Sequence, residues 1–321
     1  MLFFIKFAFQ NIDMYTNQHT LKHKYEFEGK GLHTGCKVNM SIEPAPPNHG
    51  IKFRRSDLGE GAPLVEACID YVSDTSRSTT LDKDGVTIIT LEHLMGALYA
   101  MNIDNALITL NAPEVPILDG SAKFYAEAFA KDGLVEQNAP RQYLVLDEKV
   151  VCRNEKGSEV AVLPDDHFSV DVTIDFNSKV LGTQSAHYEV DTDFVTEIAP
   201  CRTFVFFHEL EPLLKNNLIK GGDLDNALVI VENPVPQREL DRLAGLFNTE
   251  RLERVPEGYL SHTSLRFQNE CARHKLLDVL GDLSLVGYPI KGKVIANKSG
   301  HSINTKIARE LRALAVKQLS K

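Results

Sequence analysis

The stretch Arg273-His274-Lys275-Leu276-Leu277-Asp278-Val279-Leu280-Gly281-Asp282 combines apolar residues with a stripe of polar ones. The spacing predicts a largely buried amphipathic helix, on which His274 and Asp278 lie four residues apart, with Cβ atoms roughly 5–6 Å from each other. Asp282 follows one turn later on the same face. Because an uncompensated buried carboxylate is costly, a cation or a paired histidine is expected beside these side chains. An imidazole and a carboxylate at this spacing supply two of the three ligands of a catalytic zinc site, and a plain surface pair is the alternative.

The stretch Thr87–Ala100 predicts a strand end followed by a helix that carries Glu92 and His93 in its first turn. Thr90 is the expected N-cap of this helix. Adjacent residues on a helix point in different directions, so one of the pair can bind a metal while the other reaches a water molecule beside that metal. A Glu-His pair at a helix start is also common without any catalytic role.

A third candidate is His301, which follows a strand-like segment at 294–297 and a short Ser-Gly loop. Histidine titrates near neutral pH, so it suits a general acid or a stabiliser of developing negative charge. Taken alone, this motif favours a solvated loop histidine.

Six motifs along the chain resemble, in order and spacing, the UDP-3-O-acyl-N-acetylglucosamine deacetylase family of lipid A biosynthesis. They are Gly31–Gly35, Leu91–Leu94, Ile117–Ala122, Arg202–Phe204, His274–Asp278 with Gly281-Asp282, and Lys298–His301. The resemblance runs from about Lys24 to about Leu314, nearly the whole chain. No single motif is decisive, but the six together are very specific.

The resemblance implies a zinc-dependent hydrolysis of the N-acetyl group of UDP-3-O-(3-hydroxyacyl)-N-acetylglucosamine. It implies three zinc ligands, and Fe(II) could occupy the same site in the cell. It also implies a general base, a histidine that stabilises the oxyanion or protonates the leaving amine, and a carboxylate that orients this histidine. The implied zinc ligands are His93, His274 and Asp278. The implied base is Glu92, the histidine is His301, and the orienting carboxylate is Asp282.

The same resemblance implies the substrate contacts. Thr203 matches a hydroxyl near the tetrahedral oxygen, and Lys275 and Lys298 match basic residues near the nucleotide-sugar end. Two aromatic residues, Phe204 and Phe176, match positions that line the site.

The apolar stretch at 201–231 is either ordinary core or a passage for a fatty acyl chain, which binds with about 0.8 kcal/mol per buried methylene. The resemblance favours the passage, because the family carries an acyl-binding βαβ insert at this place. The candidate wall residues are Leu210, Ile219, Leu224 and Val229.

At 321 residues the chain is long enough for two domains. Polar residues and a proline at 137–141 predict a linker, which gives an N-terminal domain at 14–138 and a C-terminal domain at 141–321. Each half carries a helix with a candidate ligand histidine followed by a strand. The family fold is α+β, with two similar domains, each a two-layer β-α-α-β sandwich, with helices packed between the sheets and the active site at the domain interface. Residues 1–13 are predicted to be disordered or a start-site extension.

Composition narrows the partners and the compartment. A net charge of −9, from 35 basic and 44 acidic residues, argues against nucleic acid and against anionic membranes. No segment reaches the roughly 18 apolar residues that span a bilayer, so no stable membrane insertion is expected. Five scattered cysteines without a CxxC pair suit free thiols in the cytoplasm.

Three alternatives stay open. Another zinc hydrolase, such as a peptidase or a different sugar deacetylase, could bind zinc through the same three ligands. A binding module could hold zinc structurally, although such sites normally have four protein ligands. The chain could also be one half of a longer polypeptide, because some relatives carry a fused hydroxyacyl dehydratase. The residues themselves contain no second active site, which favours a monofunctional enzyme.

Overall fold

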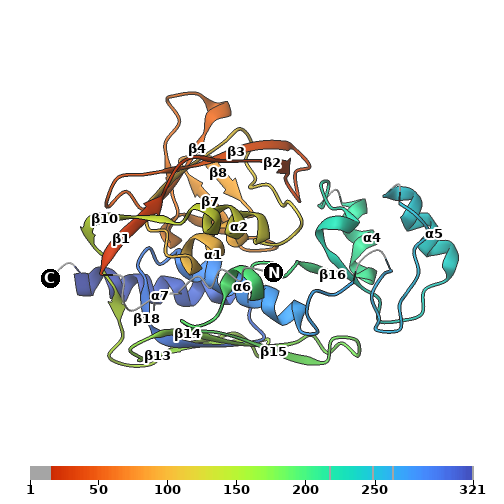
Figure 1. The fold of residues 1–321 in the computed structure, drawn as a ribbon. Helices are drawn as coiled ribbons and strands as arrows, with labels where there is room; N and C mark the ends of the chain where they lie inside the picture. Colours follow the sequence, from red (N-terminus) through yellow and green to blue (C-terminus); the bar gives the residue numbers. More distant parts are fainter. Residues whose placement is uncertain (1–15, 217, 248, 262–263, 320–321) are drawn as a thin grey trace, which may run out of the picture.

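The computed structural model describes residues 16–216, 218–247, 249–261 and 264–319. The prediction made for residues 1–13 lies outside this range. The described chain forms four stacked layers, in the order sheet, helices, helices, sheet (Figure 1). The predicted α+β class is therefore confirmed.

The two large sheets share one strand topology. The N-terminal sheet has the order β2 (Tyr25–Lys30), β3 (Lys37–Pro44), β9 (Ala106–Leu110), β4 (Ile51–Arg55) and β5 (Val65–Glu66). The C-terminal sheet has the order β12 (Val150–Arg153), β13 (Glu159–Leu163), β18 (Ile290–Asn297), β14 (Phe168–Asp175) and β15 (Thr183–Tyr188), with the short β11 (Leu144–Val145) beside β18. In both sheets the third pairing is parallel and the other three are antiparallel. This shared topology supports the expected internal similarity of the two halves.

Buried and partly exposed residues alternate along two neighbouring strands of the C-terminal sheet. In β14 and β18 every second residue is buried, so each strand turns one face to the core and one outward. The buried face is covered by helices α6 (Glu270–Ser284) and α7 (His301–Leu319), and α1 (Glu92–Ala100) and α2 (Lys123–Asp132) cover the other sheet (Figure 1). In each half the central strand follows directly on the helix that carries a candidate ligand histidine, as the sequence predicts.

Two glycines allow α1 and α6 to touch across the two helix layers. A Cβ added at Gly281 would lie 2.1 Å from the backbone oxygen of Glu92, and one added at Gly96 would lie 2.7 Å from a side-chain carbon of Leu277. No real Cβ approaches another atom so closely, so only glycine permits this crossing. The contact is what brings the first turn of α1 beside the middle of α6.

The remaining elements are small. They are β1 (Asn17–Leu21) with β10 (Leu134–Pro140), the sheet of β6 (Val72–Asp74), β7 (Thr80–Lys83) and β8 (Val86–Ile89), helix α3 (Phe194–Glu197), and the 3₁₀ helices η2 (Ser56–Leu58), η3 (Ile69–Tyr71) and η4 (Leu224–Asn226). Among the described residues, no helix combines the length and apolarity needed to cross a bilayer.

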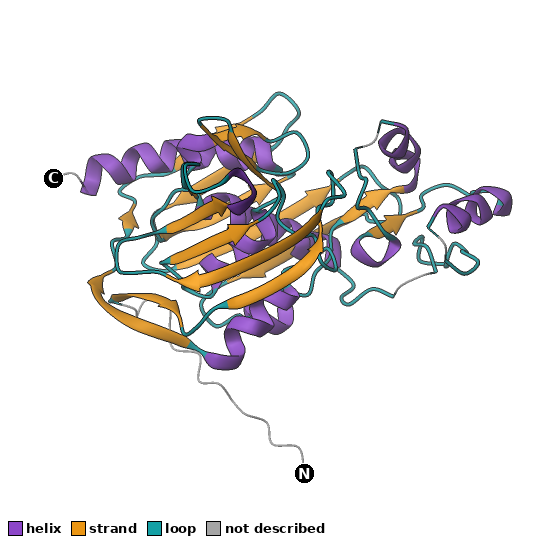
Figure 2. Cartoon of the chain, turned by 90° about the horizontal axis from the view of Figure 1, so that it is seen from above, coloured by secondary structure: helices purple, strands orange, loops and turns teal. Residues whose placement is uncertain are grey.

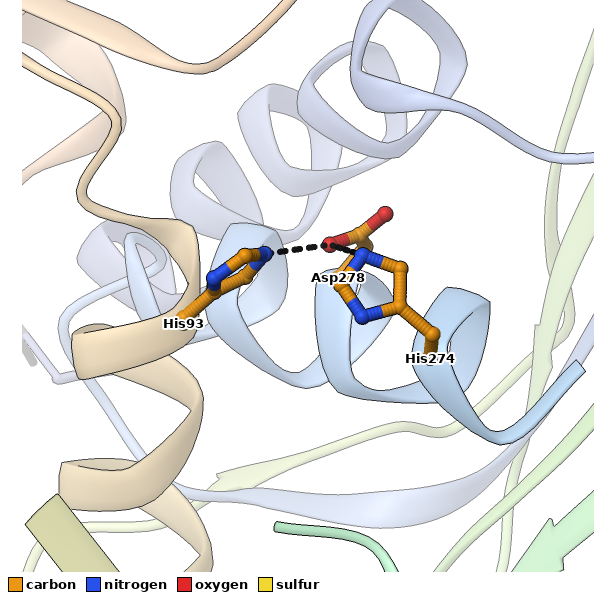
Figure 3. Close-up of side chains that lie close together, drawn as sticks. All are labelled: His93, His274 and Asp278. Carbon is orange, nitrogen blue, oxygen red and sulfur yellow. Dashed lines mark ion pairs between the residues drawn. The ribbon is translucent and has the colours of Figure 1, made fainter. Parts of the chain in front are cut away.

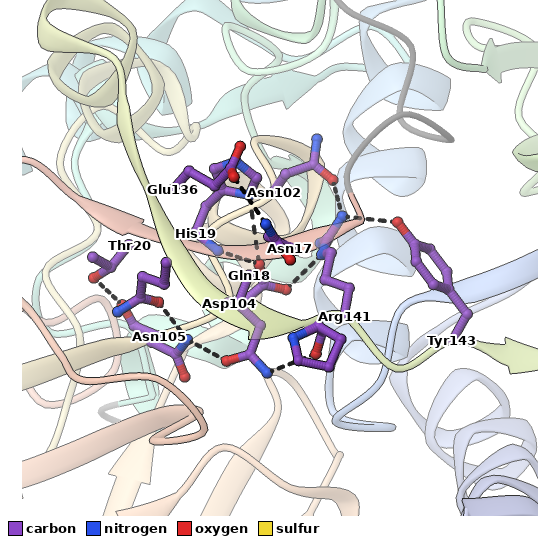
Figure 4. A network of polar contacts seen from close by, with 12 residues as sticks. Asn17, Gln18, His19, Thr20, Asn102, Asp104, Asn105, Glu136, Arg141 and Tyr143 are labelled. Atoms are coloured by element: carbon purple, nitrogen blue, oxygen red, sulfur yellow. Dashed lines mark hydrogen bonds and ion pairs between the residues drawn. The ribbon is translucent and has the colours of Figure 1, made fainter.

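The segment at 137–141, expected to be a linker between the halves, is ordered, and most of it belongs to a strand. Residues through Pro140 form β10, which pairs with β1, and the side chain of Arg141, 5% exposed, is held in a polar network (Figure 4). Its Nε donates to Asp104 Oδ1 at 2.8 Å, and its Nη1 donates to Asn102 Oδ1 at 2.8 Å and to the Tyr143 hydroxyl at 3.3 Å. Polar residues and proline are typical of linkers, but here pairing with a distant strand decides the structure.

The predicted insert is a separate lobe that extends away from the layers (Figures 1 and 2). Parallel strands β16 (Phe204–Phe206) and β17 (Leu228–Ile230) are joined through α4 (Phe207–Lys215), which makes a βαβ unit, and α5 (Gln237–Leu246) packs on it. The lobe has its own core, made of Leu210, Leu224, Val229, Val231, Leu240, Leu243, Ala244, Leu252 and Leu260. This core continues to Leu260, well past the predicted limit of 231.

Candidate active site

Helices α1 and α6 bring the three predicted metal ligands together (Figure 3). Nε2 of His93 and Nε2 of His274 lie 3.7 and 3.6 Å from the same Asp278 oxygen, and one ligand atom from each residue falls within a 4.8 Å span. All three side chains are buried. His93 comes from the N-terminal half and the other two from the C-terminal half.

The protonation states of this cluster fit a cation. Nδ1 of His274 lies 3.0 Å from the carbonyl oxygen of Cys201, to which it can donate, leaving Nε2 free as a ligand. Burial, and secondarily the neighbouring His274, lowers the pKa of His93 to about 3, and burial also lowers the pKa of His274, so both rings are neutral. Burial alone would raise the pKa of Asp278, but Lys275 and the histidines outweigh it and keep this carboxyl ionised. Two neutral imidazoles and one carboxylate are a common donor set for zinc and for Fe(II).

Lys275 lies at the cluster itself. Its Nζ donates to the second oxygen of Asp278 at 2.7 Å and lies 5.6 Å from the centre of the Phe204 ring. Lys298, the other predicted basic contact, pairs with Asp175 at 2.7 Å and is half exposed. The two lysines therefore have different surroundings, and Lys275 also neutralises a ligand carboxylate.

Glu92 and His301 face each other beside the metal ligands. Oε1 of Glu92 lies 3.7 Å from Nε2 of His301, and Nδ1 of His301 lies 2.9 Å from Asp282 Oδ2. Burial raises the pKa of Glu92 to about 7, although the charge of His301 opposes this. Burial lowers the pKa of His301, but Asp282 and Glu92 outweigh it and raise this pKa to about 10. The site thus holds a cationic imidazole next to a carboxyl that titrates near neutrality, a pairing suited to acid–base chemistry.

A largely apolar pocket of about 670 Å³ is lined by Thr203 and Phe204 together with residues of the insert. The four candidate wall residues Leu210, Ile219, Leu224 and Val229 all line it. Phe204 packs edge to face against Phe176 at 5.5 Å and lies 6.3 Å from the His274 ring. The Phe176 side chain itself is 42% exposed. Because Phe204 lines the pocket and its ring also lies next to that of His274, the pocket adjoins the candidate metal ligands.

Sequence reasoning missed two buried polar residues and misplaced a third. Thr90 is not the N-cap of α1; its φ is 59° and its hydroxyl donates to Glu114 at 2.8 Å, while Leu91 occupies the cap position. Glu114 also accepts from the backbone N–H groups of His33 and Thr34 and so fixes the loop at 31–35. Thr79 contacts both Glu92 and Asp282. The only sequence signal for Glu114 was a charged residue among apolar neighbours.

The fold and site define a class: a candidate metalloenzyme of two similar α+β halves, each of which supplies residues that could bind a metal. The family model for UDP-3-O-acyl N-acetylglycosamine deacetylase, LpxC, matches residues 18–244 and 253–313. The chain belongs to this family, which is the family that the six motifs resemble.

Three relatives illustrate the similarity. The bifunctional enzymes LpxC/FabZ of Bacteroides thetaiotaomicron and Porphyromonas gingivalis are 48% and 50% identical over 92% of this chain and 64% of each relative. The UDP-3-O-acyl-N-acetylglucosamine deacetylase of Myxococcus xanthus is 40% identical over 92% of this chain and 86% of its own length. The chain therefore spans less than two thirds of the bifunctional relatives.

Proposed function

We propose that this protein hydrolyses the N-acetyl group of UDP-3-O-(3-hydroxyacyl)-N-acetylglucosamine, giving acetate and the free amine, the committed step of lipid A biosynthesis. The observation that supports this most is the convergence of His93, His274 and Asp278 beside Glu92 and His301, next to a largely apolar pocket of about 670 Å³. Membership of the family supports the same substrate class.

His93, His274 and Asp278 would hold the metal, which we take to be Zn²⁺, with Fe²⁺ as the competitor in the cell. A zinc ion there would polarise the amide carbonyl and acidify water. Glu92 takes a proton from the attacking water as the new C–O bond forms. His301 and the hydroxyl of Thr203 stabilise negative charge on the carbonyl oxygen, and Asp282 orients His301 and keeps it cationic. The amine must leave protonated, and the groups able to deliver that proton, Glu92 and His301, lie 3.7 Å apart.

The test is acetate release from the acylated substrate, with metal content measured on the same sample. We expect turnover with about one bound metal per chain, and loss of both metal and turnover in His93→Ala, because a three-ligand site does not survive the loss of one imidazole. Metal binding without turnover, combined with hydrolysis of an unacylated amide or a peptide, would favour a different zinc hydrolase.

The pocket predicts a strong dependence on acyl length. Replacing Ile219, which lines the pocket, with Trp should fill part of it. A long chain that loses contact for four methylenes would lose about 3 kcal/mol, or more than about 100-fold in kcat/KM, and a short chain almost nothing. Leu246→Trp is the control, because Leu246 lies on the same lobe but is 59% exposed. Equal losses on long and short substrates would contradict an acyl role for this pocket.

The charge on His301 predicts a pH effect. The Asp282 carboxylate raises the pKa of His301, so the cationic ring persists to high pH. In Asp282→Asn that ring should deprotonate at lower pH, and the upper limb of the pH–kcat/KM profile should move down by about 1 to 3 units. An unmoved upper limb would show that Asp282 does not control this titration.

The finer assignments belong to the same proposal. We assign the nucleotide-sugar end to Lys275 and Lys298, and the lining of the site to Phe204 and Phe176. We also assign two domains to residues 14–138 and 141–321. Five free thiols support a cytoplasmic location. A hydroxyacyl dehydratase, fused or separate, is expected as a partner in relatives, and the relatives named LpxC/FabZ are bifunctional.

A further inference from the structure

Thr79 is a buried residue just before β7 that touches the catalytic groups of both halves. It is 1% exposed. Its backbone N–H donates to Glu92 Oε2 at 3.2 Å, and its hydroxyl donates to Asp282 Oδ1 at 2.6 Å. The hydroxyl oxygen also lies 3.3 Å from Nδ1 of His301. Thr79 thus contacts the proposed base through its backbone N–H and the carboxylate–histidine pair through its hydroxyl.

The partners of Thr79 come from different parts of the fold. Glu92 starts α1 in the N-terminal half, whereas Asp282 and His301 belong to α6 and α7 of the C-terminal half. The bond from Thr79 to Asp282 therefore joins residues 203 positions apart and crosses the interface between the halves. The relative position of base and cationic histidine depends on how the halves align there.

Among the residues that the structure describes, three donors contact the Asp282 carboxylate and fix its orientation. Thr79 occupies Oδ1, while Nδ1 of His301 and Nδ2 of Asn304 share Oδ2 at 2.9 Å each. Two of these donors come from α7, and only Thr79 comes from the other half. Without the Thr79 hydroxyl, Oδ1 loses this inter-half bond, and the carboxylate can rotate and carry the imidazole with it.

We propose that Thr79 is a positioning residue that aligns the Asp282–His301 pair with Glu92 across the interface between the two halves. This inference rests on the proposed deacetylase function. Supporting residues that orient the groups of a metal site typically contribute about 10- to 100-fold to activity.

The test compares Thr79→Val with Thr79→Ser in the metal-loaded full chain. Valine keeps the shape and removes the hydroxyl, whereas serine keeps the hydroxyl and removes a methyl group. We expect kcat to fall about 10- to 100-fold in Thr79→Val, with KM and metal content unchanged, and to stay within about 3-fold of wild type in Thr79→Ser. A space-filling role predicts the reverse order, and that order would overturn the proposal.

Two further measurements separate positioning from general damage. The loss caused by Thr79→Val should nearly vanish in an Asp282→Asn background, because residues that act through one another are not additive. The ring proton on Nδ1 of His301, followed by NMR, should shift in Thr79→Val and not in Thr79→Ser. Additive losses or an unshifted proton would contradict a role through Asp282.

Thr20→Val is the matched control. Thr20 is also buried, and its hydroxyl donates to the Asn105 carbonyl at 2.6 Å, remote from the site. It should lower the melting temperature and leave kcat unchanged. If wild type itself releases no acetate, the proposed function fails, whereas a normal wild type with an unimpaired Thr79→Val refutes the role of Thr79 alone.

Discussion

Replacing Glu92 with Gln is expected to reduce acetate release by about 10² to 10⁴-fold while one metal per chain stays bound. Glutamine has nearly the same shape and can still accept the N–H of Thr79, which lies 3.2 Å from Oε2. It cannot take a proton from water, so the loss should appear in kcat. Acetate release under substrate saturation, with metal analysis of the same preparation, measures it.

Comparison with His93→Ala distinguishes a catalytic base from a metal ligand. Both residues lie in the first turn of α1, yet one is proposed to bind the metal and the other to move a proton. Glu127→Gln, on the half-exposed face of α2, is the control for loss of one carboxylate and should leave kcat unchanged. Near-normal turnover in Glu92→Gln would remove Glu92 from the chemistry and leave another group as the base.

Replacing Gly281 with Ala is expected to destabilise the protein by about 2 kcal/mol. The new Cβ would lie 2.1 Å from the Glu92 backbone oxygen, so α1 and α6 must move apart. Overpacking against rigid backbone costs about 3 kcal/mol, and the better helix propensity of alanine returns only about 1 kcal/mol. The separation also displaces Glu92 and His93, and a shift of about 1 Å can cost about 10²-fold in rate.

Denaturant unfolding and steady-state kinetics on the same variant check both parts of this expectation. The control is Gly245→Ala in α5, where an added Cβ meets nothing within 4 Å. That change should stabilise the lobe by about 0.5 to 1 kcal/mol and leave turnover unchanged. Wild-type stability and activity in Gly281→Ala would mean that the helix crossing does not govern the site.

Local patterns predicted the elements that carry the site. The His274–Asp278 spacing, the apolar stripe around it and the break before Glu92 each depend on residues within one or two turns. The structure accordingly has a helix at each candidate ligand histidine, α1 and α6, and a strand after each helix, β9 and β18. The βαβ unit in the insert was also expected, although its core extends to Leu260.

Contacts between distant residues were not predictable in the same way. Strand β10, at 134–140, carries residues typical of linkers, but it is a strand because it pairs with β1, which lies more than a hundred residues earlier. Thr90 is a residue type that is common at helix N-caps, yet its hydroxyl donates to Glu114 instead. Thr79 has no motif at all, because its function, as we propose it, comes from a partner on the opposite half.

The sequence by itself determined the α+β class, the family, and which side chains stand one helical turn apart, because helix and strand periodicity bring near neighbours to one face. The family resemblance implied that His93 meets His274 and Asp278, but only the tertiary structure showed how they meet, and only it showed that Thr79 meets Asp282. Those meetings require two helices from different halves to touch at Gly96 and Gly281. The position of each helix depends on how all the side chains of both cores pack. No local segment of the chain determines that packing.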